Sequence, residues 1–202
     1  MKKKILIVGG TGFIGYHLAK RCLKKKWLVS SFSTSKPKKL RKLKGVHYIN
    51  GDISKKKDLN KIKKNYNYVV NLGGHVDHTD KTKTFKSHFY GSKNLAQFFL
   101  KKKIDGFIQM GSSSEYGKIK SPHKEKNFGN PKSSYGLSKL KASNILMHYF
   151  NKKNFPVIIL RLYQAYGPKQ SINRLIPITI SNCILNKTFP CTNGAQYRDF
   201  IF

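Results

Sequence analysis

The chain has 202 residues, of which 39% are hydrophobic, enough to bury one substantial core and so to form one main domain. It contains no run of about eighteen apolar residues, so the sequence predicts no membrane-spanning helix. Its 41 Lys and Arg residues against 8 Asp and Glu residues give a net charge of +33, which raises the hypothesis of a nucleic-acid-binding protein.

The composition of the basic residues argues against a specific nucleic-acid site. Only five of them are arginines, the residue best suited to bidentate contacts with phosphates and bases. The lysines are spread in short runs, as at 24–26, 55–57 and 101–103, which fall at predicted helix ends or exposed turns. We therefore expect a solvated, lysine-rich surface that adheres to nucleic acid non-specifically and in a salt-sensitive way.

The first residues do not resemble a secretory signal. Lysines at positions 2–4 precede the apolar run Ile5–Val8, which is too short for the core of a signal peptide and ends in glycines. The three cysteines, Cys22, Cys183 and Cys191, show neither metal-ligand spacing nor an even disulfide framework. Both features indicate a cytoplasmic protein with free thiols, and Cys22 is expected in the core.

Short β-branched runs alternate along the chain with helical patterns. Strands are predicted over residues 3–8, 27–32, 46–49, 68–72, 107–110 and 157–162. Helices are predicted over residues 13–26, 55–64, 84–103 and 134–150, and a further strand begins at residue 199. Strands that alternate with helices indicate βαβ units, so the expected fold is α/β, a doubly wound parallel sheet covered by helices on both faces.

A glycine-rich turn follows the first predicted strand and opens the first predicted helix, with the sequence Gly9-Gly10-Thr11-Gly12-Phe13-Ile14-Gly15. A strand, a turn and a helix form the context in which this pattern binds a dinucleotide. Glycines let the backbone turn tightly and approach a pyrophosphate, which the helix N-terminus attracts through its dipole. The alternative is a glycine-rich turn that holds no ligand.

The end of the second predicted strand bears on which dinucleotide would bind. An Asp or Glu usually follows the glycines by about twenty residues and binds the adenosine ribose hydroxyls. Here Ser33 occupies that position, and Thr34, Ser35 and Lys36 follow it. An acid would repel a 2′-phosphate, whereas hydroxyls and a lysine accept one, so the pattern favours NADP(H) over NAD(H). The same residues could equally be ordinary polar residues of a loop.

The second chemical motif is Tyr135-Gly136-Leu137-Ser138-Lys139. A tyrosine and a lysine four residues apart lie on one face of a helix, where the ammonium lowers the tyrosine pKa and lets the phenol exchange a proton with substrate. This spacing also arises by chance in a chain rich in both residues. Support comes from the segment 111–117, which follows a predicted strand and offers serines that could hold the same oxygen.

Five motifs in this order resemble the extended short-chain dehydrogenase/reductases, the NAD-dependent epimerase/dehydratase family of nucleotide-sugar enzymes. They are the glycine fingerprint, the serine segment 111–117, the Tyr135–Lys139 pair, the segment 161–168 and Arg198-Asp199-Phe200. The resemblance covers all 202 residues. It implies a Rossmann domain over residues 1–168 and an incomplete substrate-binding domain over 169–202, which would leave apolar surface exposed near residues 172–202.

The resemblance also implies roles for single residues. The catalytic residues would be Ser112, with Ser113 and Ser114 as alternatives, together with Tyr135 and Lys139. Besides Tyr135 and Lys139, the residues that contact NADP or NAD would be Gly9, Gly12, Phe13, Ile14, Gly15, Ser33, Lys36, Asp52, Ile53, Leu72 and Gly73. Asn173 and Arg198 would hold the diphosphate of a nucleotide-sugar substrate, and the family resemblance leaves a homodimer open.

Some positions depart from the family pattern. Dehydratases carry Asp-Glu directly after the catalytic Thr, where this chain has Ser113 and Ser114, and Glu115 comes one position late. His88 replaces a common asparagine, and Gln164 replaces another. No metal site is expected, because His17, His75 and His78 come without clustered carboxylates and are expected on loops or helix surfaces.

The expected activity is hydride transfer at a sugar carbon, as in a nucleotide-sugar epimerase or 4-ketoreductase. One alternative is a catalytically silent relative that senses dinucleotides or binds nucleic acid, and another is an inert fragment. The intact set of Ser112, Tyr135 and Lys139 favours an enzyme, because a sensor needs no acid/base.

Overall fold

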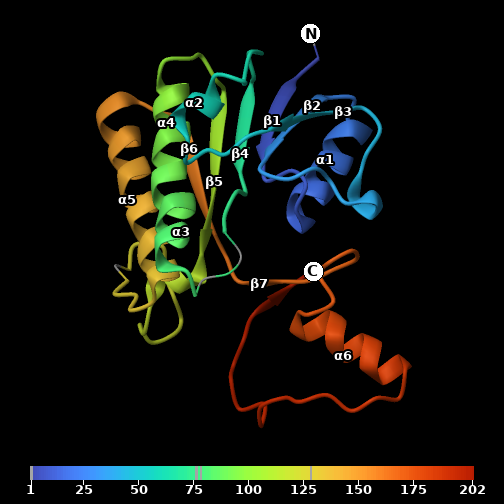
Figure 1. Cartoon of the computed structure of the whole chain (residues 1–202). Coiled ribbons are helices and arrows are strands. Elements are labelled where there is room, and N and C mark those ends of the chain that lie inside the picture. The colour runs from blue at the N-terminus through green and yellow to red at the C-terminus, as the bar shows by residue number, and fades with distance from the viewer. Residues whose placement is uncertain (1, 76, 78, 128) are drawn as a thin grey trace. The chain divides into compact units, whose positions relative to one another are not determined.

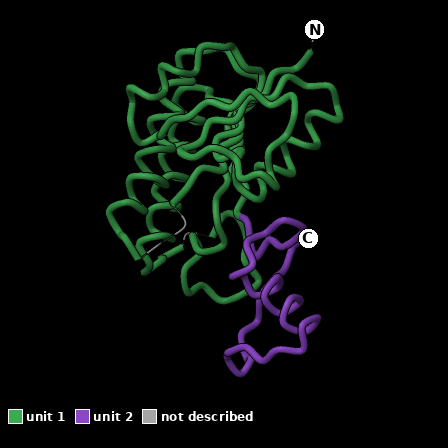
Figure 2. Tube along the Cα trace, turned by 45° about the vertical axis from the view of Figure 1, so that its right-hand side comes forward, with its two compact units in different colours: residues 1–161 green, residues 162–202 purple. Residues whose placement is uncertain are grey.

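The computed structural model describes residues 2–75, 77, 79–127 and 129–202. These residues form two compact units, 1–161 and 162–202, which are described separately (Figure 2). The first unit holds most of the predicted strands and helices. The domain boundary predicted after residue 168 stays a prediction, while the division between compact units falls after Arg161.

The first unit is built on a six-stranded sheet in the order β3-β2-β1-β4-β5-β6 (Figure 1). The strands are β1 (Lys4–Val8), β2 (Leu28–Ser33), β3 (Val46–Asn50), β4 (Tyr68–Asn71), β5 (Gly106–Ser112) and β6 (Val157–Leu162). β1 pairs in parallel with both β2 and β4, and the pairs β2–β3 and β4–β5 are parallel too. The predicted α/β fold with a doubly wound parallel sheet is therefore confirmed.

Alternate residues of β1 enter two separate hydrophobic clusters, one on each face of the sheet. Ile5 and Ile7 pack with Ala19 of helix α1 (Phe13–Lys24). Leu6 and Val8 belong to the other cluster, which contains buried residues of α4 (Gly91–Leu100) and α5 (Ser134–Lys153). Figure 1 shows α1 on one side of the sheet and α4 and α5 on the other. Both faces are covered because successive side chains of a strand point in opposite directions.

Two predicted helices differ from those observed. The helix expected over 55–64 is only the four-residue α2 (Lys56–Leu59). It ends early because Asn60 is a poor helix former and the neighbouring lysines repel one another. The helix expected over 84–103 begins earlier, with α3 (Lys81–Phe85), where Asp80 accepts a hydrogen bond from the Lys83 amide. It continues through a π-helical segment, Lys86–Tyr90, into α4.

The second unit contains two short parallel strands and one helix. β7 (Gln164–Ala165) pairs with β8 (Phe200–Ile201), which lies within the predicted strand near residue 199. Helix α6 (Leu175–Ile184) was not predicted, and none of its residues is buried although it is largely apolar. The predicted exposed apolar surface near residues 172–202 is therefore present, with Leu175 55% exposed and Ile184 78% exposed.

Among the described residues, no helix combines the length and the apolar character needed to cross a membrane.

Candidate active site

The turn between β1 and α1 packs closely against the end of β4. Gly9 has a positive φ of 77°, and a Cβ added there would lie 2.9 Å from the Leu72 carbonyl oxygen. A Cβ at Gly15 would collide with the backbone of Gly9 and Gly10. At Gly12, by contrast, the added atom would meet only the Gly9 oxygen, at 3.2 Å. Gly9 and Gly15 therefore allow the turn to pack, whereas Gly12 is less crowded, with one tight contact to a backbone oxygen.

The N-terminus of α1 is suited to an anion. Gly12 is its extended N-cap residue and supplies no side-chain cap, and the first turn contains no acidic residue. The amides of Phe13 and Ile14, at the start of the helix, have no acceptor within it, and the helix dipole places positive potential there. These amides, beside a residue without a side chain at Gly12, fit the pyrophosphate of a dinucleotide, as the glycine pattern predicts.

The end of β2 lies beside this turn. The Ser33 side chain is only 8% exposed, and its Oγ accepts a hydrogen bond from the Thr11 amide at 3.5 Å. The hydroxyls of Ser31 and Ser33 are 3.4 Å apart. Lys36 is exposed. Ser33 thus links β2 to the glycine turn, while Lys36 carries a free-standing positive charge near the strand end.

The remaining predicted cofactor contacts follow β3 and β4. Asp52 accepts a hydrogen bond from the Ser54 amide at 2.8 Å, so it shapes the loop after β3. Ile53 is buried in the core cluster. Leu72 and Gly73 follow β4, and the Gly73 amide donates to Asn71 Oδ1 at 3.1 Å. β4 neighbours β1 at the point where the strand order reverses, which is where open α/β sheets bind ligands. Contact of these residues with a dinucleotide stays a prediction.

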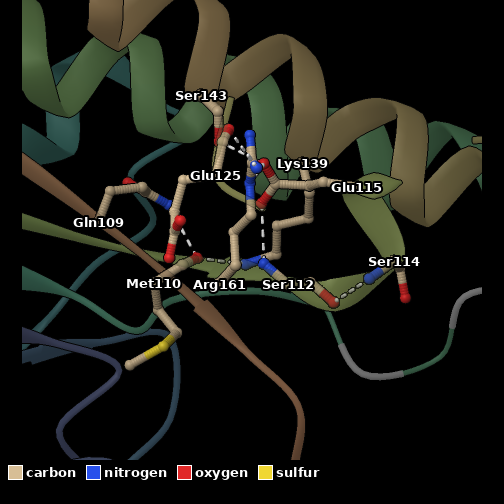
Figure 3. Close-up of polar contacts among 9 residues, drawn as sticks. All are labelled: Gln109, Met110, Ser112, Ser114, Glu115, Glu125, Lys139, Ser143 and Arg161. Carbon is tan, nitrogen blue, oxygen red and sulfur yellow. Dashed lines mark hydrogen bonds and ion pairs between the residues drawn. The ribbon is translucent and has the colours of Figure 1, made fainter. Parts of the chain in front are cut away.

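A chain of buried hydrogen bonds runs along the carboxyl ends of β4 and β5. Asn71 Nδ2 donates to Ser92 Oγ at 3.0 Å and to Gln109 Oε1 at 2.9 Å. Gln109 Nε2 in turn donates to the Met110 carbonyl at 3.2 Å, and Lys139 Nζ donates to the same carbonyl at 2.8 Å (Figure 3). Sequence analysis did not identify Gln109, whose role depends on contacts across the sheet.

The three predicted catalytic residues come from β5 and α5. Ser112 ends β5, and its Oγ accepts a hydrogen bond from the Ser114 amide at 3.1 Å. Tyr135 and Lys139 lie in the first two turns of α5, which Ser133 caps by accepting from the Gly136 amide. Lys139 Nζ lies 5.8 Å from the centre of the Tyr135 ring. The structure thus brings Tyr135 and Lys139 together, and Lys139 reaches the strand that ends at Ser112.

Lys139 is almost completely buried, at 5% exposed. Burial disfavours its ammonium form and lowers its pKa from 10.5 to about 8, while the negative charge of Glu115 opposes this shift. The ammonium form still dominates below pH 8, so Lys139 can act as a cation beside Tyr135 near neutral pH.

Glu115 forms hydrogen bonds to several elements of the site, a role that sequence analysis did not assign to it. Its Oε1 accepts from the Ser112 amide at 2.8 Å, and its Oε2 accepts from Ser143 Oγ at 2.7 Å. Arg161 Nε lies 3.2 Å from the same Oε2 and forms an ion pair with it. Sequence analysis noted Glu115 only as an acid that comes one position late, although one of only eight acidic residues directly after the predicted catalytic serines is a signal for a role in the site.

His88 is buried in the π-helical segment and packs against Tyr135. The two rings are 5.0 Å apart in an edge-to-face arrangement of 80°, and His88 Nε2 lies 3.1 Å from the His75 carbonyl oxygen. A Cβ on Gly74 would collide with the His88 ring. His88, which replaces an asparagine common in the resembling family, therefore contacts Tyr135, the predicted acid/base.

The remaining predicted positions are His17 in α1, His78, and the two substrate residues of the second unit. His17 packs edge-on against Phe13 and Tyr16 within α1. His78 lies outside the described residues, and among the described residues no three His, Cys, Asp or Glu side chains gather where they could hold a metal ion. Asn173 and Arg198 are exposed in the second unit, and their binding role stays a prediction.

Comparison with known proteins places the chain in a family. The model of the NAD dependent epimerase/dehydratase family matches residues 5–202. The chain belongs to this family. Among its relatives, a dTDP-D-glucose 4,6-dehydratase of Dictyostelium discoideum is 30% identical over 236 residues, which cover 99% of this chain and 52% of that protein. A UDP-glucose 4-epimerase of Vibrio cholerae is 28% identical, over 86% of this chain and 55% of that protein.

Solved structures of the family show the same fold. A UDP-glucuronic acid 4-epimerase of Bacillus cereus, in complex with UDP-glucuronic acid and NAD, is 26% identical and superposes with a TM-score of 0.83. The comparison covers 98% of this chain and 68% of that one. A UDP-glucose 4-epimerase of Thermotoga maritima with UDP-glucose gives a TM-score of 0.91 at 21% identity. The chain therefore spans about half the length of the two relatives named above and about two thirds of these solved chains.

Proposed function

We propose that this chain is the dinucleotide-binding part of a nucleotide-sugar epimerase or 4-ketoreductase. The observation that carries the proposal is the Tyr135–Lys139 pair on α5, with Lys139 Nζ 2.8 Å from the carbonyl oxygen of Met110, two residues before Ser112. Tyr135 would transfer the proton of a sugar hydroxyl, and Ser112 would hydrogen-bond the same oxygen. The Lys139 ammonium would favour the phenolate form of Tyr135.

The proposed cofactor is a nicotinamide dinucleotide, which when bound exchanges a hydride with a sugar carbon, here taken to be C4. The N-terminus of α1, with Gly12 as its N-cap residue, would hold its pyrophosphate. Lys139 would also contact its ribose. Support comes from the Bacillus cereus epimerase, whose structure contains NAD and UDP-glucuronic acid. Asn173 and Arg198 would hold the diphosphate of the nucleotide sugar.

Within this proposal, the end of β2 favours NADP(H). It carries no acid, Lys36 is exposed, and an exposed cation attracts a 2′-phosphate. Calorimetric titration of the chain with NADPH and with NADH tests this directly, and tighter binding of NADPH is expected. Ser33→Asp should reverse the preference. Equal affinities, or tighter binding of NADH by the parent chain, would remove the inference and match the NAD in the solved relative.

Substitution of Tyr135 tests the enzymatic function. In a protein that contains this chain and turns over a nucleotide sugar, Tyr135→Phe should lower kcat by about two to four orders of magnitude and leave dinucleotide affinity nearly unchanged. Tyr90→Phe is the matched control, because Tyr90 is exposed and should tolerate loss of its hydroxyl. Turnover by Tyr135→Phe within a factor of a few of the parent would favour the second candidate, a catalytically silent dinucleotide sensor.

We further propose a cytoplasmic location and no specific nucleic-acid partner. Cys183 and Cys191 are exposed and free, as is usual in a reducing compartment. The positive charge is carried mostly by lysine rather than arginine, which suits non-specific adhesion. A homodimer stays open, and sedimentation of the complete protein would decide it.

A further inference from the structure

Glu115 is a buried carboxylate in a chain that has few carboxylates. Only 8 of the 202 residues are acidic, yet this one is 1% exposed. Removing a charge from water is costly unless ion pairs and hydrogen bonds compensate it. Both carboxylate oxygens of Glu115 have such partners, so the site is built around a retained negative charge.

The partners of Glu115 come from three separate elements. The Ser112 amide lies at the end of β5, Ser143 lies on α5, and Arg161 lies on β6 (Figure 3). Ser143 follows Lys139 by one helical turn and so lies on the same face of α5. One carboxylate therefore ties the face of α5 that carries Lys139 to the backbone of Ser112.

Arg161 extends this arrangement beyond the carboxylate. Its Nη1 donates to the Glu125 carbonyl at 3.0 Å, and its guanidinium lies 4.6 Å from the centre of the Tyr116 ring. Arg161 thus balances the charge of Glu115 from the side of β6. The position of Glu115 is fixed by bonds on both oxygens rather than by its own flexible side chain.

The charged and titratable groups around Lys139 are few. Tyr135 comes from its own helix, Glu115 from the segment after β5, and Arg161 from β6, while His88 contacts Tyr135 from the π-helical segment. Burial lowers the pKa of Lys139, and Glu115 is the residue whose charge opposes that effect. Arg161 is a second cation beside the same carboxylate, so its positive charge partly offsets the negative charge that acts on Lys139.

We propose that Glu115 is a positioning residue for the site proposed above: it holds the backbone of Ser112 against the face of α5 that carries Lys139. A negative charge held at this place would also favour the ammonium form of the buried Lys139. This inference rests on the proposed function only in that the proposed function gives Ser112 and Lys139 catalytic roles. The charge state of Lys139 and its dependence on Glu115 can be measured without any turnover.

Glu115→Gln tests the proposal, because it keeps the size of the side chain and removes its charge. Lysine labelled with 13C at Cε is incorporated into the 202-residue chain, and NMR follows each signal with pH; the Lys139 signal is the one lost in Lys139→Arg. The pKa of Lys139 is expected to fall by about one unit below its parent value. Glu125→Gln is the matched control and should leave it unchanged, since the backbone carbonyl of Glu125 makes the contact with Arg161.

A second variant guards against misfolding of the first. Arg161→Gln removes the competing cation, so the pKa of Lys139 is expected to rise. Glu115→Asp keeps the charge and should restore most of the parent value. An unchanged Lys139 pKa in folded Glu115→Gln, or in Arg161→Gln if Glu115→Gln does not fold, overturns the proposal. Loss of turnover in Tyr135→Phe bears only on the proposed function, so failures of the two proposals can be told apart.

Discussion

Lys139 sits in an environment that opposes its own charge. Burial lowers its pKa to about 8, and the Met110 carbonyl and the Glu115 carboxylate are what stabilise the ammonium there. A cation of this kind is useful beside Tyr135, because a charge in a low-dielectric site acts more strongly on its neighbour than an exposed one. The same environment makes folding sensitive to the protonation of this residue.

The first prediction concerns the pH dependence of stability. Below about pH 8 both folded and unfolded chains protonate residue 139, and the folded state bears the full desolvation cost. Between pH 8 and 10.5 the unfolded chain binds a proton that the folded chain has released, so the free energy of unfolding rises with pH because of Lys139. The difference in this free energy between the parent and Lys139→Met should grow by about 2–3 kcal/mol across that window.

Urea unfolding at a series of pH values measures this difference. Lys141→Met is the matched control, since Lys141 is exposed on the same helix and should show no such growth. A parent-minus-Lys139→Met difference that stays flat from pH 7 to 10.5 would contradict the assigned pKa.

Sequence analysis could identify only those site residues that share a local spacing. The four-residue interval between Tyr135 and Lys139 marks one helix face, and the serines after a predicted strand point to Ser112. Glu115 and Gln109 received no role because each has a partner that is distant in sequence: Arg161 is 46 residues from Glu115, and Asn71 is 38 residues from Gln109. Such pairs become visible only once the sheet order is known.

At the scale of single elements, the glycines of the first turn divide into two kinds. Gly12→Ala places a methyl group 3.2 Å from the Gly9 oxygen, its one close neighbour, so we predict that stability falls by about 1 kcal/mol while dinucleotide affinity falls at least about tenfold. Gly15→Ala forces a methyl group into the backbone of Gly9 and Gly10 and should lower stability by about 1–3 kcal/mol. Thermal unfolding and calorimetric titration separate the two effects. Unaltered dinucleotide binding by Gly12→Ala would show that the pyrophosphate does not bind beside Gly12.

In the π-helical segment, the His88 ring packs closely against Gly74. His88 is held by the His75 carbonyl and by the Tyr135 ring, so it cannot move aside cheaply for a methyl group on Gly74. We predict that Gly74→Ala lowers the free energy of unfolding by about 1–3 kcal/mol, and that His88→Asn, which shortens the side chain, recovers about 1 kcal/mol of that loss. A double-mutant cycle measured by urea unfolding gives the coupling.

A matched control for this cycle is Gly106→Ala. An added Cβ at Gly106 would lie 3.4 Å from the Tyr68 ring, an ordinary contact, so its effect should be independent of His88. If Gly74→Ala lowers the free energy of unfolding equally in the parent and in His88→Asn, the backbone at Gly74, and not the His88 ring, causes the loss.

The elements themselves were predictable to different degrees. The strands of the first unit were found because buried parallel strands are continuous β-branched and apolar runs. The π-helical segment was predicted as α-helix, since hydrophobic periodicity does not distinguish a single π-helical turn from an α-helical one. Helix α6 was missed because Pro177, Thr179 and Asn182 are poor helix formers, and none of its residues is buried.

At the scale of the whole molecule, a net charge of +33 opposes self-association while the exposed apolar surface of the second unit favours it. Salt screens the repulsion, so we predict that the 202-residue chain associates more strongly as ionic strength rises. Sedimentation at about 0.05 and 0.5 M salt measures this. Ile184→Lys should suppress association, whereas Leu40→Lys, at a residue 75% exposed in the first unit, should not. Association that weakens with salt would indicate a charge-driven contact instead.

The last prediction concerns turnover by these 202 residues alone. About a third of the length of the solved relatives has no counterpart in this chain, and α6 has no buried residue. Catalysis requires that water is excluded and the sugar is oriented, and a misplacement of about 1 Å can cost about a hundredfold in rate. We therefore expect dinucleotide binding, for which all predicted contacts lie in the first unit, with little or no turnover of UDP- or dTDP-sugars. The assay pairs calorimetric titration with NADPH or NADH and product detection by chromatography, on protein whose mass is confirmed. Robust turnover would show that Asn173, Arg198 and the residues around them already form a working substrate site.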